Sequence, residues 1–199
     1  MQQVLILFAH PKFELSRVNK ALVDRAKKKE GVTFHDLYER YPDFNVDVEL
    51  EKHLLSEHDI VLWHHPFYWY SAPPLLKQWI DLVLEFGWAY GPEGDALAGK
   101  QAMNVLTAGG TREVYCGQGK NQYSINEFLR PFEQTARLCG MDYLPPFTVM
   151  GTTLLSDEDL VRHVNQFEAF IDILQAQVSA RDVGRCDFFN DLPQLTQMI

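Results

Sequence analysis

Residues 4–20 of the chain read VLILFAHPKFELSRVNK, an apolar run followed by a polar loop and an amphipathic segment. Residues 4–9 are nearly all apolar, as expected of a strand that is covered on both faces of a sheet. Ser16 then opens a stretch in which apolar residues such as Leu22 recur at helical spacing, and we expect Gly31 to close that helix. The segment therefore predicts a β-strand joined to an α-helix, the repeating unit of an α/β fold.

The same alternation continues along the chain. Further strands are predicted at residues 32–37, 60–64, 101–107 and 147–150. Helices are predicted at residues 74–86, 124–139 and 157–177. Strands that are separated by helices, without hairpin turns, favour parallel pairing with right-handed crossovers. We therefore expect an α/β fold with a doubly wound five-stranded parallel sheet and helices on both faces.

We expect one domain at residues 1–178 and a C-terminal tail at residues 179–199. A length of 199 residues suits a single hydrophobic core. The tail mixes charged residues with Phe188, Phe189 and Leu192. It either packs on a second subunit or is disordered, and the sequence leaves both alternatives open.

The charge and the cysteines of the chain narrow its function class. There are 18 Lys and Arg against 27 Asp and Glu, a net charge of -9, which disfavours nucleic acid as a partner. The first apolar run ends at His10, too early for a signal peptide, and no later run predicts a membrane span. The three cysteines are widely spaced and form no CxxC motif, so we expect a reducing, cytoplasmic location.

Ligands of open parallel sheets bind beyond the carboxyl ends of the strands, where the strand order reverses. The first loop at that edge, residues 10–19, leads from a strand into a helix, where free backbone N–H groups and the helix dipole favour a phosphate. The loop contains neither the GxGxxG fingerprint nor a P-loop motif. Ser16 is also a good N-cap in a helix that binds nothing, so both interpretations stay open.

Two further loops at the same edge have an unusual composition. Residues 65–74 place adjacent aromatic side chains between prolines, which suits a flat aromatic ligand, although aromatic residues are as common in cores and interfaces. Residues 107–110 read Thr-Ala-Gly-Gly and lead to Tyr115. Their glycines would let backbone N–H groups approach a ligand closely, and a plain Gly-Gly turn is the alternative.

Metal and nucleophile chemistry are disfavoured. His10, His64 and His65 end neighbouring strands, but no carboxylate or cysteine stands nearby at ligand spacing. Ser16 or Cys116 as a nucleophile would need a base and an orienting group, and the sequence contains no GxSxG elbow. We therefore predict no metal site.

Six short motifs follow one another in a fixed order along the chain. They are Ala9-His10-Pro11 with Ser16 and Asn19, Leu37-Tyr38 with Tyr41-Pro42-Asp43-Phe44, His65-Pro66 with Trp69-Tyr70-Ser71, Pro73-Pro74-Leu75-Leu76-Lys77, Gly87-Trp88-Ala89-Tyr90-Gly91, and Leu144-Pro145-Pro146-Phe147. Through these motifs the chain resembles the flavodoxin-like NAD(P)H:quinone oxidoreductase family over residues 4–149. The resemblance is closest to the ancillary proteins of glutathione-gated potassium-efflux systems.

The resemblance implies a flavodoxin-like fold and a bound flavin, FMN or FAD, through which a hydride passes from NADH or NADPH to a quinone in a ping-pong cycle. It also implies that the three loops hold the flavin, with the phosphate end on the first loop. The implied cofactor-binding residues are His10, Ser16, Arg17, Val18, Asn19, Phe67, Tyr68, Trp69, Tyr70, Thr107, Ala108, Gly109 and Gly110. The alternative function is a regulatory subunit that docks on a potassium/proton antiporter at the inner face of the membrane.

One branch of the family has a Tyr, and a His six residues later, that are proposed to relay a proton. Tyr115 matches that Tyr and is the predicted catalytic residue, but Asn121 stands where the His would be, and an amide cannot act as a general acid near neutral pH. Family members are commonly homodimers. Phe86, Trp88 and Tyr90 form either an interface patch or part of the core. A one-electron carrier is disfavoured, because its Thr/Ser-rich phosphate loop is missing.

Overall fold

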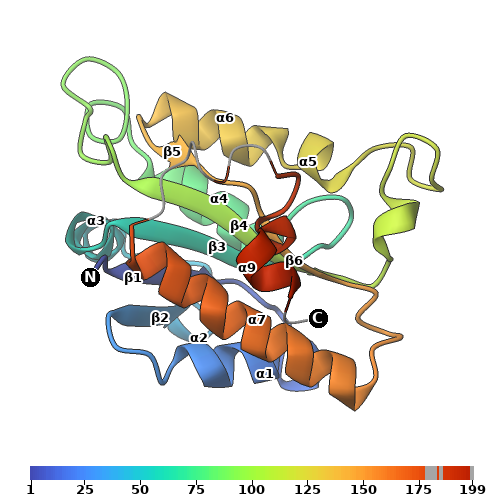
Figure 1. Cartoon of the computed structure of the whole chain (residues 1–199). Coiled ribbons are helices and arrows are strands. Elements are labelled where there is room, and N and C mark those ends of the chain that lie inside the picture. The colour runs from blue at the N-terminus through green and yellow to red at the C-terminus, as the bar shows by residue number, and fades with distance from the viewer. Residues whose placement is uncertain (178–182, 184–185, 198–199) are drawn as a thin grey trace.

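One parallel sheet runs through the computed structural model, which describes residues 1–177, 183 and 186–197 (Figure 1). Its strands are β1 (Val4–Phe8), β2 (Val32–Asp36), β3 (Ile60–Pro66), β4 (Gln101–Ala108), β5 (Asp142–Tyr143) and β6 (Phe147–Met150). Their order is β2-β1-β3-β4-β5, and β6 also pairs with β4. The chain passes from β1 outward to β2 and then returns to β3 on the other side of β1, so the order reverses between β1 and β3.

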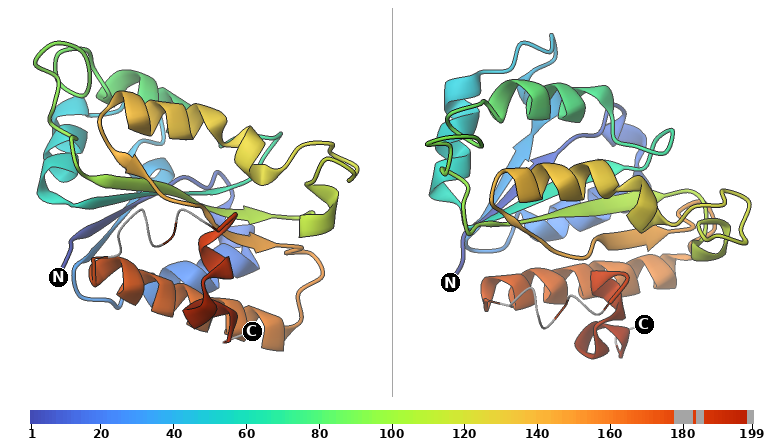
Figure 2. Two further views of the ribbon diagram at one scale, coloured as in Figure 1. Left: turned by 45° about the horizontal axis from the view of Figure 1, so that its top comes forward. Right: turned by 90° about the horizontal axis from the view of Figure 1, so that it is seen from above.

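Helices cover both faces of this sheet (Figures 1 and 2). One face carries α1 (Arg17–Ala26) and α7 (Asp157–Gln175), and the other carries α3 (Val48–Glu57), α4 (Pro74–Val83) and α6 (Arg130–Leu138). The shorter helices are α2 (Leu37–Arg40), α5 (Ile125–Phe128) and α9 (Pro193–Thr196), and single 3-10 turns are η1 (Phe13–Leu15), η2 (Arg112–Val114) and η3 (Phe189–Asp191). The predicted doubly wound α/β fold is confirmed.

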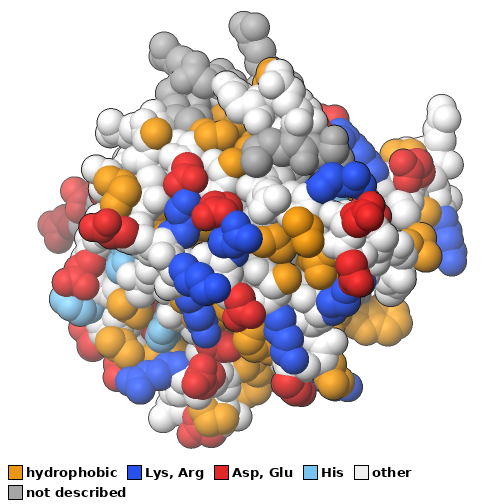
Figure 3. All heavy atoms as spheres, turned by 60° about the horizontal axis from the view of Figure 1, so that its bottom comes forward, with side chains coloured by type: hydrophobic (Ala, Val, Ile, Leu, Met, Phe, Trp, Pro, Cys, Tyr) orange, Lys and Arg blue, Asp and Glu red, His pale blue; other side chains and the backbone are white. Residues whose placement is uncertain are grey.

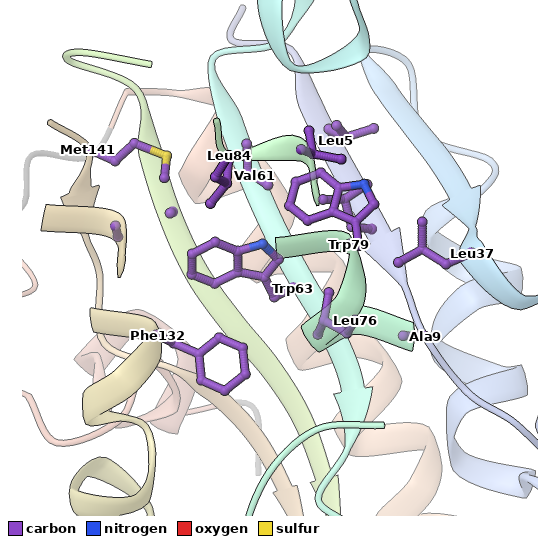
Figure 4. Packing of buried hydrophobic residues seen from close by; sticks show 14 of the residues in the cluster. Leu5, Ala9, Leu37, Val61, Trp63, Leu76, Trp79, Leu84, Phe132 and Met141 are labelled. Carbon is purple, nitrogen blue, oxygen red and sulfur yellow. The ribbon is translucent and has the colours of Figure 1, made fainter. Parts of the chain in front are cut away.

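Each face of the sheet has its own hydrophobic core. Leu5 and Leu7 of β1 face α4, where Trp63 and Trp79 are almost fully buried (Figure 4). The alternate residues of β1 face α1 and α7, because successive side chains of a strand point to opposite faces. Both faces of β1 are therefore dry, which explains why its sequence is an unbroken apolar run.

Ion pairs join α1 to α7 on the outside of the second core. They are Arg17–Asp157, Arg25–Glu168 and Lys29–Asp172. Figure 3 shows basic and acidic side chains intermingled over this face, so the net negative charge of the chain does not form a single acidic field here. Within the described chain, none of the helices combines the length and the apolar character needed to cross a lipid bilayer.

Several helix ends in the structure differ from the ends that the sequence predicts. The first helix ends at Ala26, and Gly31, with φ of 71°, lies in the turn before β2 instead of closing the helix. The helix predicted at residues 74–86 is α4, and it ends at Val83. The segment 124–139 divides into α5 and α6 around Leu129, because Pro131 has no N–H to continue the helical hydrogen bonds.

The fifth strand pairs with β4 in two pieces. β5 pairs with the start of β4 and β6 with its end. Between them stand Pro145 and Pro146, which have no N–H to donate to the ladder. The sequence predicts only the second piece, since the first contains two residues.

The described part of the tail packs on its own chain. Phe189 and Leu195 are fully buried in the core beneath α7, and the Phe189 N–H donates to the Pro146 carbonyl at 2.9 Å. The Asn190 side chain bonds both the N–H and the C=O of Thr148 in β6. The expected boundary between residues 178 and 179 lies outside the described residues.

Candidate functional site

A pocket of about 320 Å³ lies beyond the carboxyl ends of β1, β3 and β4, where the strand order reverses. The loops after these strands, the start of α1 and the loop after β6 form its walls. Its lining residues are His10, Lys12, Leu15, Ser16, Arg17, Val18, Asn19, Pro66, Phe67, Tyr68, Thr107, Gly109 and Thr152. All five residues that the sequence predicts from the first loop are among them.

The start of α1 forms the polar wall of the pocket. Ser16 caps the helix: its Oγ accepts hydrogen bonds from the backbone N–H of Asn19, at 3.3 Å, and from the Asn19 side-chain Nδ2, at 2.9 Å. Lys12 and Arg17 add positive charge, although Arg17 is also paired with Asp157 at 2.6 Å. A helix N-terminus flanked by two cations favours an anionic group. Ser16 is thus both an N-cap and a pocket residue.

His10 lies at the end of β1, between this wall and the aromatic wall. Its Nδ1 accepts a hydrogen bond from the Lys12 N–H at 3.1 Å, so in the neutral ring Nε2 carries the proton. Burial lowers the pKa of His10 below its ordinary value, despite the opposing effect of nearby Glu14. His10 therefore presents one N–H donor and no charge near neutral pH.

The loop after β3 forms the aromatic wall. The Phe67 N–H donates to the Thr107 carbonyl at 2.7 Å, which ties this loop to β4. Tyr68 and Ser71 exchange backbone hydrogen bonds of 3.1 and 3.0 Å and close a two-residue turn. Phe67 and Tyr68 line the pocket, and the Tyr68 ring meets the His10 ring edge-on at 5.9 Å.

Trp69 and Tyr70 form the tip of that turn, and the structure does not place them in the lining of the pocket. Their φ angles are 49° and 62°, as in a type I′ turn. Trp69 is 92% exposed, and Tyr70 stacks on Phe128 at 5.1 Å. The sequence shows that four aromatic residues are adjacent, but it does not show the positive φ angles that separate them.

The loop after β4 contributes only two of its four predicted residues. Thr107 and Gly109 line the pocket. Ala108 points to the opposite side and is buried in the core beneath α4 and α6. Gly110 faces η2, because a Cβ atom on it would lie 2.8 Å from side-chain atoms of both Val114 and Tyr115.

Tyr115 also lies behind the pocket instead of in its lining. Its ring packs edge-on against Phe67, with centroids 5.5 Å apart. Burial, and to a lesser extent Tyr70, raises the pKa of Tyr115, so the phenol is protonated at neutral pH. Asn121 lies on the same loop and accepts a long hydrogen bond of 3.5 Å from the Tyr70 hydroxyl.

Four lining residues were not predicted: Lys12, Leu15, Pro66 and Thr152. The first three belong to the loops that the sequence singles out, and only their inclusion was missed. Thr152 follows β6, and the rule that ligands bind beyond the carboxyl ends of strands points to that loop too.

The histidines at the end of β3 are buried and bonded to protein groups. Burial lowers the pKa of His64 to about 3 and that of His65 to about 4, so both rings are neutral near pH 7. His64 contacts Asn19, and His65 contacts the Pro66 carbonyl and Asn104. Among the described residues, no three His, Cys, Asp or Glu side chains are grouped so that they could hold a metal.

The walls of the pocket fit a flat ligand with an anionic end. The cationic start of α1 suits the anion, and Phe67 and Tyr68 offer an aromatic surface to the flat part. The backbone can approach the ligand closely at Gly109, where an added Cβ would meet only Thr153, at 3.9 Å. A flavin mononucleotide has this combination of a planar ring and a terminal phosphate.

Comparison with known proteins gives the family of the chain and relatives that bind FMN or are named reductases. A family model described as a flavodoxin-like fold matches residues 2–171. The glutathione-regulated potassium-efflux system ancillary protein KefG of Salmonella paratyphi B is 42% identical over 165 residues, which are 83% of this chain and 90% of that protein. The crystal structure of general stress protein 14 from Treponema denticola in complex with FMN is 40% identical, with a TM-score of 0.83 over 87% of this chain and 99% of that one. An NADPH-quinone reductase from P. pentosaceus is 32% identical, with a TM-score of 0.78 over 84% of this chain and 96% of that one.

Proposed function

Since this chain belongs to the flavodoxin-like fold family, we propose that its pocket binds FMN and that it is an NAD(P)H:quinone oxidoreductase. The observation that carries the proposal is the helix N-terminus of α1, with Lys12 and Arg17, opening on a pocket that has an aromatic wall. The related general stress protein 14 was crystallised with FMN, and the related reductase from P. pentosaceus is described as an NADPH-quinone reductase. FAD is the alternative cofactor, and NADH the alternative donor.

The chemistry that FMN supplies when bound is acceptance of a hydride from NADH or NADPH and delivery of both electrons to a quinone, in ping-pong order. Ser16, Arg17, Val18 and Asn19, with Lys12, hold the phosphate through backbone N–H groups, hydroxyl groups and positive charge.

Phe67 and Tyr68 would orient the ring system and exclude water from it. Neutral His10 would offer its Nε2–H to the bound cofactor, and Thr107 and Gly109 would contact it from the end of β4. The catalytic role of Tyr115 stays a prediction: its protonated phenol can donate a hydrogen bond, and Asn121 stands where the resemblance places the His that relays a proton.

The visible spectrum of the purified protein tests the proposal. After reconstitution with FMN and removal of free flavin, we expect protein-bound flavin bands that bleach with anaerobic NADPH or NADH and return with a simple quinone. Protein that retains no flavin after reconstitution would overturn the cofactor assignment. Bands that do not bleach with either nucleotide would overturn the proposed activity but would still support FMN binding.

Gly109→Val tests where the ring lies. Gly109 lines the pocket, so the new side chain should weaken FMN binding at least about tenfold. Stability should change by less than about 1 kcal/mol, because the atom nearest to an added Cβ, a side-chain carbon of Thr153, lies at an ordinary contact distance of 3.9 Å. Gly99→Val is the control, since Gly99 has no neighbour within 4 Å of an added Cβ and lies outside the pocket. Because Gly99 has a φ of 78°, that control should lose stability but keep FMN affinity.

A second candidate function is supported by the 42% identity to KefG, whose name places it in a potassium-efflux system. We propose that the protein also docks on the cytoplasmic side of a potassium/proton antiporter, where it would be peripheral to the membrane. Retention of the protein by antiporter-containing vesicles, but not by protein-free vesicles, supports docking. Redox turnover without such retention would contradict docking and would support the oxidoreductase function only.

We also propose a homodimer. Phe86 is 69% exposed beside Trp88 and Tyr90, which pack partly against the core beneath α4. An exposed aromatic side chain at the edge of a packed cluster is typical of an interface. A mass of two chains for the wild type and of one chain for Phe86→Asp, measured by light scattering, would support a homodimer. A wild-type protein with the mass of one chain would contradict it.

A further inference from the structure

Beneath the pocket, a buried side chain of β3 is connected by hydrogen bonds to two pocket hydroxyl groups. We propose that His64 is a positioning residue that acts through Asn19 and holds the hydroxyl groups of Ser16 and Thr107 as hydrogen-bond donors toward the bound ligand. Asn19 lies between them, with contacts to His64 Nε2 at 2.9 Å, Ser16 Oγ at 2.9 Å and Thr107 Oγ1 at 3.0 Å. The inference rests on the proposed binding of FMN for its effect on affinity, but not for the hydrogen bonds themselves.

The direction of these hydrogen bonds follows from the chemistry of the groups. The Asn19 carbonyl oxygen Oδ1 faces His64, and an oxygen only accepts, so His64 Nε2 must carry the ring proton. The two hydrogens of Asn19 Nδ2 are then used by Ser16 Oγ and Thr107 Oγ1, which both act as acceptors. Each hydroxyl keeps its own hydrogen, and neither donates it to a protein group in the described chain.

The opposite direction would require the Asn19 amide to rotate by half a turn. His64 Nε2 would then accept, and the ring proton would move to Nδ1. His64 Nδ1 is buried and has no hydrogen-bond partner within the part of the chain that the structure describes. The ring is packed edge-on against Phe8 and lies near Phe167, at 5.0 and 5.9 Å between centroids.

An unpaired N–H buried among phenylalanines is less favourable than an unpaired ring nitrogen, because orphaned buried donors are rarer than under-used acceptors. The apolar surroundings of His64 therefore select the Nε2–H form. Burial also lowers the pKa of His64, which excludes a doubly protonated ring at neutral pH. His64 thus determines the orientation of Asn19.

The orientation of the Asn19 amide determines whether two hydroxyl groups of the pocket act as hydrogen-bond donors or as acceptors toward a ligand. Ser16 and Thr107 both line the pocket. As donors, their hydroxyl groups suit the acceptor oxygens of a phosphate or of a flavin ring; as acceptors, they would oppose a phosphate. Nothing about His64 itself touches the ligand, so its effect is transmitted entirely through the Asn19 amide.

The first test uses the wild-type protein without any variant of the pocket. Two-bond 1H–15N correlation of the imidazole groups distinguishes the two tautomers of a neutral histidine, and His64→Gln identifies the His64 signals by their loss. We expect the Nε2–H tautomer in the protein without flavin. An Nδ1–H tautomer would overturn the proposal whether or not the protein binds FMN.

The second test measures dissociation constants for FMN and for riboflavin, which lacks the phosphate, by quenching of flavin fluorescence. His64→Phe should raise the FMN constant roughly tenfold and the riboflavin constant less, because one or two donors are lost. His64→Gln can donate from an amide N–H in place of Nε2 and should restore FMN affinity to within about threefold of wild type.

Two controls separate positioning from a general loss of structure. His58→Gln changes another buried histidine, whose partners are the Leu54 carbonyl and the Thr33 hydroxyl, and should leave both constants unchanged. In Ser16→Ala, the added His64→Phe change should cost less FMN affinity than it costs in the wild type, because the two residues act in series.

The possible outcomes are distinct. Equal FMN affinity of His64→Phe and wild type, or fully additive losses with Ser16→Ala, would overturn the proposal. A wild-type protein that binds no FMN at all would overturn the proposed function instead, and the tautomer would still decide whether His64 orients Asn19.

Discussion

Two neighbouring histidines of β3 illustrate how much a single residue contributes through its tautomer. His65 Nδ1 lies 3.0 Å from the Pro66 carbonyl, which only accepts, so Nδ1 carries the proton and Nε2 accepts from Asn104. His64 carries its proton on Nε2. Consecutive strand residues face opposite sides of the sheet, so His64 contacts Asn19 of α1, whereas His65 stacks on Phe132 of α6 with ring centroids 5.6 Å apart.

The same burial makes stability depend on pH. Below the ordinary pKa of 6.5 the unfolded chain protonates both histidines, whereas the folded protein keeps them neutral until the pH approaches about 4 for His65 and about 3 for His64. Their contribution to stability is therefore complete above pH 6.5 and is lost as the pH falls through this window. The slope should be at most about 1.4 kcal/mol per pH unit for each histidine.

Urea unfolding at about pH 7 and about pH 5 measures that slope. His65→Asn, which can still donate to the Pro66 carbonyl, should lose less free energy between the two pH values than the wild type does. Since other groups titrate equally in both proteins, the difference isolates His65. Identical slopes would show that His65 titrates in the folded protein as it does in the unfolded chain.

At the scale of the element, the turn after β3 has a backbone conformation that its aromatic residues rarely adopt. Trp69 and Tyr70 both have positive φ, a conformation that Asn and Gly adopt more readily than aromatic residues. Trp69 is almost fully exposed, so little packing is lost when it is replaced.

We expect Trp69→Asn to raise the free energy of unfolding by about 0.5–1 kcal/mol, because Asn tolerates the left-handed conformation of this turn. Trp69→Val should lower it, since β-branched residues are the least tolerant of positive φ. Chemical denaturation of the three proteins provides the comparison. A lower stability for the Asn variant would mean that the Trp69 side chain makes a stabilising contact, in the folded protein or between subunits.

The sequence predicts the elements of this fold better than their ends. The strands β1, β3 and β4 are long and buried on both faces, and β1 is wholly apolar, so their sequences predict strands clearly. The two-residue strand β5 is cut short before Pro145 and Pro146 and pairs with β4 far along the chain, and the division of α5 from α6 depends on Pro131. For the pocket, all five residues predicted from the first loop line it, because that loop lies at the end of a central strand, although Lys12 and Leu15 of the same loop were not predicted. The turn at Trp69 instead depends on φ angles that aromatic residues rarely adopt.

At the scale of the whole molecule, the C-terminal tail connects the sheet, α7 and the loop after β4. Arg112 of η2 forms two hydrogen bonds with the Asp191 carboxylate, at 2.8 and 2.9 Å, and lies over the Phe188 ring at 4.5 Å. Asn190 bonds Thr148 in β6 and Gln166 in α7. The family model ends at residue 171, so these contacts belong to a part of the chain that follows the family match.

Phe189 decides whether the tail unfolds together with the domain. Its side chain is fully buried and meets Phe170 of α7 edge-on, with centroids 4.9 Å apart. Phe189→Ala should lower the free energy of unfolding by about 3–5 kcal/mol, through lost burial and the cavity left behind. Leu154→Ala is the control: Leu154 is 77% exposed, so its loss should change stability by less than about 0.5 kcal/mol. If Phe189→Ala instead unfolds at the same urea concentration as wild type, the tail detaches before the rest of the domain unfolds, and the contacts of Arg112 with Asp191 then add nothing to its global stability.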